Sequence, residues 1–445
     1  QLVDAVWIDG TTQTGFSSSP LISIVDGASL GYGVRLGSGS DGSTIQGLNI
    51  QGFSTAGIEV LSSTNTIVGN WIGTNSSGNS TAGNGIGIRI STGDDNVIGG
   101  ITSLSRNVIS GNTSSGISLL SGANNSHIMG NYIGLGADGS TSVGNVTGIS
   151  VSGSSTGTII GTNGDGSNDT AERNVISANQ YGVLLSGSGT SSNHVYGNYI
   201  GTDTTGLLDR GNTNYGVRIE SDATGNYIGG TAAGTGNLIA GNDGDGIQVN
   251  GENTDGNYLY RNLIGLAADG TTVLGNSGNG IAITGGADNT IIGGIGLGNT
   301  IVGSGLYGIH INGSSTGTAL YGNYIGTNAA ANLIGGNSRS GVFLESGVAN
   351  TTVGGTTSGQ ENVISNNGEG STQYNAGVQL ATSAGTGNLI VGNQIYSNSG
   401  IAIDLGATGP DAIDSLDSDS GPNNLQNYPV LTQVTTDQAG TVTVS

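Results

Sequence analysis

Residues 84–90 read NGIGIRI, and the unit Gly87-Ile88-Arg89-Ile90 within them decides the fold. Isoleucine alternates there with a small or charged residue, which is the period-2 pattern of a β-strand. We therefore expect Ile88 and Ile90 on one face of the strand and Arg89 on the other. Such a strand has a single apolar face to bury.

The same glycine-led unit recurs along the chain at a mean spacing of about 31 residues. Thirteen copies begin at Gly33, Gly57, Gly87, Gly116, Gly148, Gly182, Gly216, Gly246, Gly280, Gly308, Gly341, Gly377 and Gly400. Two further short apolar units lie between successive copies, as NTIVG at Asn65 and NWIGT at Asn70 show. Each period thus contains three short strands separated by turn residues.

Each period has three strands, and each strand has one apolar face. This pattern predicts a chain that coils on itself and stacks its strands into three parallel sheets around a narrow core. The expected fold class is all-β, a parallel β-helix (β-solenoid) of about 13 coils with three strands per coil. We expect residues 33–407 to form the β-helix, residues 1–32 to add N-terminal strands or a cap, and residues 408–445 to form an acidic loop and C-terminal strands. Asparagines at one place in the period are expected to form hydrogen-bonded ladders: Asn65, Asn96, Asn193, Asn226, Asn289 and Asn350.

The runs GNYIGT, NVISGN and GNGIGI and the terminal GPNNLQNYPVL resemble those of bacterial secreted proteins with right-handed parallel β-helix repeats. These belong to the pectate-lyase-like superfamily, near its carbohydrate-binding and sugar-hydrolase repeats. The resemblance covers about Gly33 to Leu431, and it implies a right-handed coil, in line with the general preference for right-handed crossovers. In that family the chain usually continues from the NYPVL-like motif into a β-sandwich module. The resemblance is specific for fold and weak for activity.

Composition excludes several classes of protein. The formal net charge is −22, so phosphate backbones and anionic lipid should repel the chain, and we expect no nucleic-acid partner. No apolar run approaches the length of a membrane-spanning helix. Cysteine is absent, which removes disulfides and thiolate chemistry. We expect a secreted or cell-surface location.

One set of outward residues has a catalytic pattern. Arg35, Glu59 and Arg89 fall on three successive coils and should stack as plus, minus, plus. An arginine base beside carboxylates is what a lyase of this superfamily needs, but a salt-bridge ladder is the favoured interpretation. The three histidines fall on different coils. Few charged residues are expected to point outward elsewhere, and the chain has no lysine. We therefore expect a structural role rather than an enzyme.

An outward aromatic and aliphatic stripe follows the NWIGT-like strands: Trp71, Val108, Tyr132, Val175, Tyr199, Leu238, Leu263 and Tyr324. If the stripe is exposed, Trp71, Tyr132, Tyr199 and Tyr324 are candidate ligand-binding residues for sugar rings or another protein. Long loops alternate in position from coil to coil, in register with these aromatics. Burial of the stripe beneath the loops as a second small core is the favoured alternative.

Carboxylates gather near the C-terminal end, at Asp404, Asp411, Asp414, Asp417 and Asp419. Oxygen-only ligands at such spacing suit calcium, the one cofactor that the sequence suggests. A solvated acidic loop explains the same residues equally well.

Two classes of function remain. The first is a stiff extracellular rod, an adhesin or a filament in which copies of the chain join head to tail, because the apolar AVWID near Trp7 and the C-terminal PVLTQV and GTVTV segments have no evident partner strands. The second is a polysaccharide-active enzyme (lyase, hydrolase or epimerase) or a carbohydrate-binding protein. An enzyme should concentrate its charged residues on a few consecutive coils, whereas a rod should spread them thinly.

Overall fold

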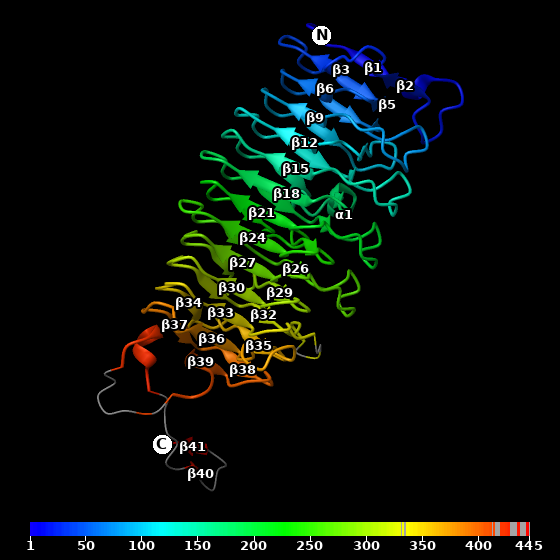
Figure 1. The fold of residues 1–445 in the computed structure, drawn as a ribbon. Coiled ribbons are helices and arrows are strands. Elements are labelled where there is room, and N and C mark those ends of the chain that lie inside the picture. The colour runs from blue at the N-terminus through cyan, green and yellow to red at the C-terminus, as the bar shows by residue number, and fades with distance from the viewer. Residues whose placement is uncertain are drawn as a thin grey trace.

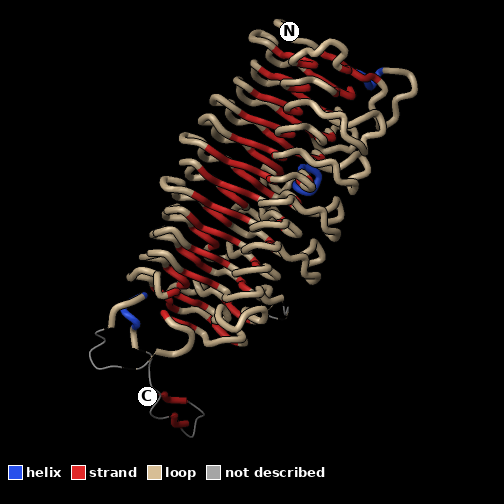
Figure 2. The backbone as a smooth tube through the Cα atoms, viewed as in Figure 1, coloured by secondary structure: helices blue, strands red, loops and turns tan. Residues whose placement is uncertain are grey.

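The computed structural model describes residues 1–330, 332, 335–411, 413 and 419–427, and the backbone of residues 434–436 and 442–444. The chain winds into a stack of coils, and each coil contributes one strand to each of three parallel sheets of 13 strands (Figure 1). Short strands are joined by many loops and turns, and the helices are short turns (Figure 2). This architecture is the parallel β-helix that the repeats predict.

We call the three sheets A, B and C. Sheet A contains the glycine-led strands: β3 (Tyr32–Leu36), β6 (Ala56–Val60), β9 (Ile86–Ile90), β12 (Ser115–Leu119), β15 (Thr147–Val151), β18 (Tyr181–Ser186), β21 (Val217–Glu220), β24 (Ile247–Asn250), β27 (Ile281–Thr284), β30 (Ile309–Ile311), β33 (Val342–Leu344), β36 (Val378–Ala381) and β39 (Ile403–Gly406).

Sheet B follows sheet A within each coil and contains β1 (Trp7–Asp9), β4 (Thr44–Gln46), β7 (Thr66–Val68), β10 (Val97–Gly99), β13 (His127–Met129), β16 (Ile159–Gly161), β19 (His194–Tyr196), β22 (Tyr227–Ile228), β25 (Tyr258–Leu259), β28 (Ile291–Gly293), β31 (Ala319–Tyr321), β34 (Thr352–Gly354) and β37 (Leu389–Val391).

Sheet C closes the coil and contains β2 (Ile22–Val25), β5 (Leu48–Gln51), β8 (Trp71–Ile72), β11 (Val108–Ile109), β14 (Tyr132–Ile133), β17 (Val175–Ile176), β20 (Tyr199–Ile200), β23 (Leu238–Ile239), β26 (Leu263–Ile264), β29 (Thr300–Ile301), β32 (Tyr324–Ile325), β35 (Val363–Ser365) and β38 (Gln394–Tyr396). The helical turns are η1 (Gly10–Thr12), α1 (Asp169–Glu172) and η2 (Pro422–Leu425).

The core is a column of aliphatic side chains enclosed by the three sheets. Ile88 and Ile90 of β9 are fully buried in it, whereas the Arg89 side chain is 30% exposed on the outer face. The strands that begin near Gly33, Gly57 and Gly87 are neighbours in sheet A, in the parity that the alternation predicts. Both predictions are confirmed.

Buried asparagines bind the coils to one another between sheets B and C. From Asn70 to Asn362, each Nδ2 in this ladder donates to the asparagine Oδ1 of the next coil over 2.9–3.2 Å. Its members are Asn70, Asn107, Asn131, Asn174, Asn198, Asn237, Asn262, Asn299, Asn323, Asn362 and Asn393. The expected pairs Asn65–Asn96 and Asn193–Asn226 also form. Asn289 and Asn350 were wrongly assigned to a ladder: both have a φ of 54°, a left-handed turn conformation that asparagine tolerates.

Two predictions at the C-terminal end are wrong. The last strand of sheet A begins at Ile403, which lies beside Val378, so the expected strand at Gly400 is displaced by two residues. A shift of two keeps the same side chains inward, and no further coil buries the strand among the described residues to select one register. The C-terminal strands β40 (Val434–Thr436) and β41 (Val442–Val444), expected to lack partners, pair antiparallel with each other.

Candidate functional site

Polar and aromatic side chains gather on the outer face of sheet A between β18 and β36. They come from the coils of β18, β21, β24, β30, β33 and β36: Tyr181, Tyr215, Arg218, Glu220, Asp245, Gln248, Tyr307, His310, Arg339, Glu345 and Tyr374. The expectation that charged residues are spread thinly is therefore wrong for this face. We call these residues the sheet A cluster.

His310 is held in one tautomer by a carboxylate on the next coil. Its Nε2 lies 2.9 Å from Glu345 Oε1, and its side chain is 13% exposed. Because an ionised carboxylate only accepts hydrogen bonds, neutral His310 donates its Nε2–H and carries its lone pair on Nδ1. Burial lowers the pKa of His310, and Glu345 and Asp245 oppose that shift. Neutral His310 therefore offers Nδ1 as a hydrogen-bond acceptor.

An aromatic group lies beside His310. The Tyr307 ring stacks on Phe343 with centroids 4.5 Å apart and lies 5.1 Å from the His310 ring. Arg339 donates from Nη1 to the Tyr307 hydroxyl over 3.3 Å, and its guanidinium lies 5.2 Å from the ring centroids of both Tyr307 and Tyr374. Among the described residues Arg339 has no carboxylate partner, so its remaining N–H groups are available to a ligand.

Asp245 adds a buried carboxyl group to the cluster. It is only 8% exposed, and its oxygens accept hydrogen bonds from the Asn279 N–H, the Asn279 Nδ2 and Gln248 Nε2 over 2.7, 2.8 and 3.2 Å. Burial raises the pKa of Asp245, although the Asn279 hydrogen bonds act in the opposite direction. A carboxyl and an imidazole with opposite pKa shifts on one face can exchange protons with a ligand.

The cluster continues toward both ends of sheet A. Arg218 Nε pairs with Glu220 Oε2 over 2.6 Å, and its guanidinium lies 5.0 Å from the Tyr215 ring. Ser340 Oγ donates to Gln379 Oε1 over 2.6 Å, and Gln379 Nε2 donates to Asp404. The polar side chains therefore form a nearly continuous line parallel to the solenoid axis.

Arg35, Glu59 and Arg89, the residues of the catalytic alternative, form an ion-pair ladder. Glu59 lies between the two arginines, 3.3 Å from Arg35 Nε and 3.9 Å from Arg89 Nε, and it is almost fully buried. Ser91 Oγ also donates to it over 2.8 Å. These residues lie at the opposite end of sheet A from His310 and do not join the cluster.

The stripe on sheet C is covered by loops. Trp71 is 8% exposed, and Tyr132, Tyr199 and Tyr324 are half-buried. Loop glycines Gly78, Gly139 and Gly206 approach the first three rings so closely that a Cβ on each would lie 2.9–3.1 Å away. The loops and the stripe thus form the second small core, except where a recess beside Trp71, Val108 and Tyr132 stays open.

The expected calcium ligands are only partly visible. Asp414 and Asp417 lie outside the described residues, and no group of three metal-binding side chains occurs within the part that the structure describes. Asp404 accepts from Gln379 Nε2 and from the Gly409 N–H, and burial raises its pKa to about 6, with Asp411 adding to the rise. Calcium binding by Asp404, Asp411, Asp414, Asp417 and Asp419 stays a prediction.

The sequence does carry a signal for the sheet A cluster. The residue before the strand glycine is small or aliphatic from Ala56 to Thr147, and it is tyrosine, aspartate or asparagine in the five coils from Tyr181 to Tyr307. The alternation within the strands does not predict which way these residues point, because they lie at the corner that precedes each strand. The histidines are indeed far apart, since His127 and His194 lie on sheet B.

The comparisons with known proteins concern the fold only. No protein-family profile and no curated protein matches the sequence. Among solved structures, the periplasmic alginate epimerase AlgG matches at 12% identity and a TM-score of 0.35, over 84% of this chain and 69% of that one. The mannuronan C-5 epimerase AlgE4 A-module of Azotobacter vinelandii matches at 14% identity and a TM-score of 0.39, over 83% and 91%. Both are right-handed parallel β-helix proteins. This chain has the parallel β-helix fold. That conclusion rests on its own sheet topology.

The described residues contain no helix of the length and hydrophobicity that a membrane crossing requires.

Proposed function

We propose that this protein is an extracellular β-helical rod that binds a polysaccharide along the outer face of sheet A. The observation that carries the proposal is the sheet A cluster, in which the coils of β18, β21, β24, β30, β33 and β36 add hydrogen-bonding or aromatic side chains to one line. Parallel strands repeat every 4.7–4.9 Å or so. An extended glycan laid parallel to the axis therefore meets a new set of side chains about once per sugar.

The chemistry of the cluster suits sugar hydroxyls. His310 Nδ1 accepts a hydrogen bond, the free N–H groups of Arg339 donate, and the half-buried Tyr215 and Tyr374 present aromatic surface for the apolar face of a pyranose. These groups are fixed in place by contacts with neighbouring coils, so little side-chain entropy is lost on binding.

Charge favours an uncharged polysaccharide over a polyanion. The chain carries a formal net charge of −22, which repels polyanions at long range. Within the cluster Glu220 is paired with Arg218 and Glu345 with His310, so no excess of positive charge compensates for that repulsion.

Turnover of the bound chain is a second candidate function. It is favoured by the Glu345–His310 pair, because a histidine whose Nε2–H is held by a carboxylate presents Nδ1 as a general base. Activity of this kind would appear as new reducing or unsaturated chain ends.

Affinity electrophoresis tests the binding proposal. Xylan, glucomannan and β-glucan serve as neutral polymers, and alginate and pectate as polyanions. At least one neutral polymer is expected to retard the protein, and His310→Ala should weaken that retardation. His127→Ala is the matched control, since His127 is a half-buried histidine on sheet B whose Nε2 contacts the Gly161 carbonyl. Absence of binding to every polymer, or binding to polyanions alone, would contradict the proposal.

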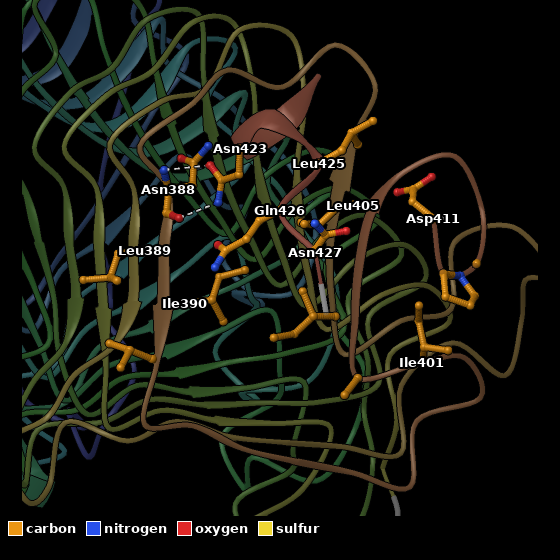
Figure 3. A pocket seen from close by; sticks show the side chains of 15 residues that line it. Asn388, Leu389, Ile390, Ile401, Leu405, Asp411, Asn423, Leu425, Gln426 and Asn427 are labelled. Atoms are coloured by element: carbon orange, nitrogen blue, oxygen red, sulfur yellow. Dashed lines mark hydrogen bonds between the residues drawn. The ribbon is translucent and has the colours of Figure 1, made fainter. Parts of the chain in front are cut away.

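We also propose that copies of the rod join head to tail. Apolar side chains are exposed at both ends: Val3, Trp7, Leu21, Ile22 and Val25 at one, and Leu389, Tyr396, Ile401 and Ile403 at the other. Leu389, Ile401 and Ile403 border a cavity of about 580 Å³ at the end of the core, partly closed by Leu425 and by Asn423, which exchanges hydrogen bonds with Asn388 (Figure 3). Burial of such ends against another copy removes apolar surface from water.

A further inference from the structure

A recess opens on the sheet C side of the rod, near the N-terminal end and away from the sheet A cluster. Its volume is about 360 Å³, within the range of small-ligand sites. Trp71, Val108 and Tyr132 form its floor on three successive coils. Four loops form its walls and bring Ser18, Ser77, Arg106 and Asp138 to it. Trp71 and Tyr132 are two of the ligand-binding candidates of the stripe, so the loops leave part of that stripe accessible.

Arg106 is the best-placed donor in the recess. Its guanidinium lies 4.3 Å from the Tyr132 ring centroid, and its Nε donates to the Gly130 carbonyl over 3.2 Å. Among the described residues its two terminal nitrogens have no hydrogen-bond partner, although the guanidinium plane is fixed. A fixed guanidinium with free N–H groups is preorganised to donate two hydrogen bonds to a ligand.

The next pair of coils repeats the arginine contact without the same surroundings. Arg173 lies 3.9 Å from the Tyr199 ring centroid and donates from Nε to the Gly197 carbonyl over 3.2 Å. The loop that carries Arg173, between β16 and β17, is longer and contains α1 (Asp169–Glu172), whereas the loop that carries Arg106, between β10 and β11, is short. The arginine–tyrosine contact is therefore a common structural feature, and the recess is particular to Arg106.

The lining favours an uncharged hydroxylated ligand. Arg106 and Asp138 bring one positive and one negative charge, so the recess has no net charge to attract an ion. Serine hydroxyls donate and accept, the guanidinium donates, and Trp71 and Tyr132 offer aromatic surface to apolar C–H groups. A sugar ring carries hydroxyl groups that can donate and accept these hydrogen bonds, and it has an apolar C–H face that can pack on the aromatic rings.

From this geometry we propose that the recess between Trp71, Arg106, Tyr132 and Asp138 is a second binding site, which takes one uncharged sugar unit. It lies on a different sheet from the His310 cluster and has its own neighbours. The two sites are therefore tested separately, and His310→Ala leaves binding in the recess unchanged.

Tryptophan fluorescence reports on this site directly. The chain has two tryptophans, and Trp7 is 72% exposed on β1, so Trp7→Phe leaves Trp71 as the single reporter. Glucose, galactose and mannose and their β-1,4-linked tetrasaccharides are titrated into this variant, with galacturonate as the charged comparison. At least one neutral sugar is expected to give a saturable change in Trp71 emission.

Arginine variants in the Trp7→Phe background separate binding from stability. Arg106→Ala is expected to weaken the fluorescence titration at least tenfold, whereas Arg173→Ala removes the equivalent arginine–tyrosine contact and leaves the titration unchanged. Similar melting temperatures of the two variants show that both fold. No saturable change with any neutral sugar, a response to galacturonate alone, or equal weakening by both variants would overturn the proposal.

Discussion

At the scale of single residues, burial sets the protonation of the sheet A cluster. Burial lowers the pKa of His310 and raises the pKa of Asp245, although Glu345 accepts a hydrogen bond from His310 and Asn279 and Gln248 donate to Asp245. Both shifts favour the neutral form of the group, and a neutral group can face sugar hydroxyls without the desolvation cost of a buried charge. The cluster is thus suited to uncharged ligands.

The lowered pKa of His310 predicts a pH dependence of stability. Because the folded pKa lies below the unfolded value of about 6.5, His310 contributes stability that is present above that value and is lost as pH falls through the folded pKa. The groups that face it are Glu345, Asp245 and Arg339. His310→Gln keeps a donor for Glu345 and cannot titrate, so its melting temperature should fall less than that of the wild type between pH 7 and pH 5. Parallel curves for the two proteins would contradict this assignment.

At the scale of elements, the asparagine ladder is what holds short strands in register. Strands of two residues, such as β17 and β20, have few ladder bonds of their own, and Asn174 supplies the rest. It accepts from the N–H and the Nδ2 of Asn131, and it donates to the Ile128 carbonyl and to Asn198. Coils are thereby linked through side chains as well as through backbone hydrogen bonds.

Asn174→Ala should destabilise the protein by about 3 kcal/mol, because two buried donors of Asn131 lose their acceptor. Asn163→Ala is the control, since Asn163 is exposed in a loop, and its effect should stay within about 0.5 kcal/mol. Denaturant unfolding of both variants measures the difference. A loss for Asn174→Ala no larger than that of the control would show that the ladder does not hold the coils together.

The elements were predictable to different degrees. The alternation at Ile88 and Ile90 was enough to predict the strand, the side chains that point inward and the sheet that contains it. A shift of one residue would turn the apolar side chains outward, so a strand with one buried face has a single favourable parity. The displaced strand at Ile403 and the turn residue Asn289 were missed because those patterns fit two registers equally well. Of the candidate site, the alternation within the strands predicts only the outward direction of central residues such as Arg218 and His310. Its partners Asp245 and Tyr307 lie at corners, where the side-chain direction depends on turn geometry.

At the scale of the whole molecule, the rod has apolar ends with acidic residues around them. Asp4, Asp9 and Asp26 lie near the exposed Trp7 end, and Asp404 and Asp411 near the other. Repulsion between these carboxylates opposes head-to-tail contact and is screened by salt. Calcium would neutralise the same groups more effectively than a monovalent ion.

Sedimentation velocity should therefore show the protein growing in mass as ionic strength rises, and more strongly with calcium. Trp7→Asp places a further charge on the apolar end and is expected to keep the protein monomeric under the same conditions. A wild-type protein that stays monomeric in high salt and in calcium would rule out head-to-tail assembly.

The central claim is that the sheet A cluster binds a polysaccharide, and the dissociation constant of the best-bound neutral polymer tests it most directly. It is measured by isothermal titration for the wild type, for Arg339→Ala, and for Arg35→Ala as an arginine of the same sheet outside the cluster. We predict at least tenfold weaker binding for Arg339→Ala and unchanged binding for Arg35→Ala. Equal dissociation constants for the wild type and Arg339→Ala would contradict the claim.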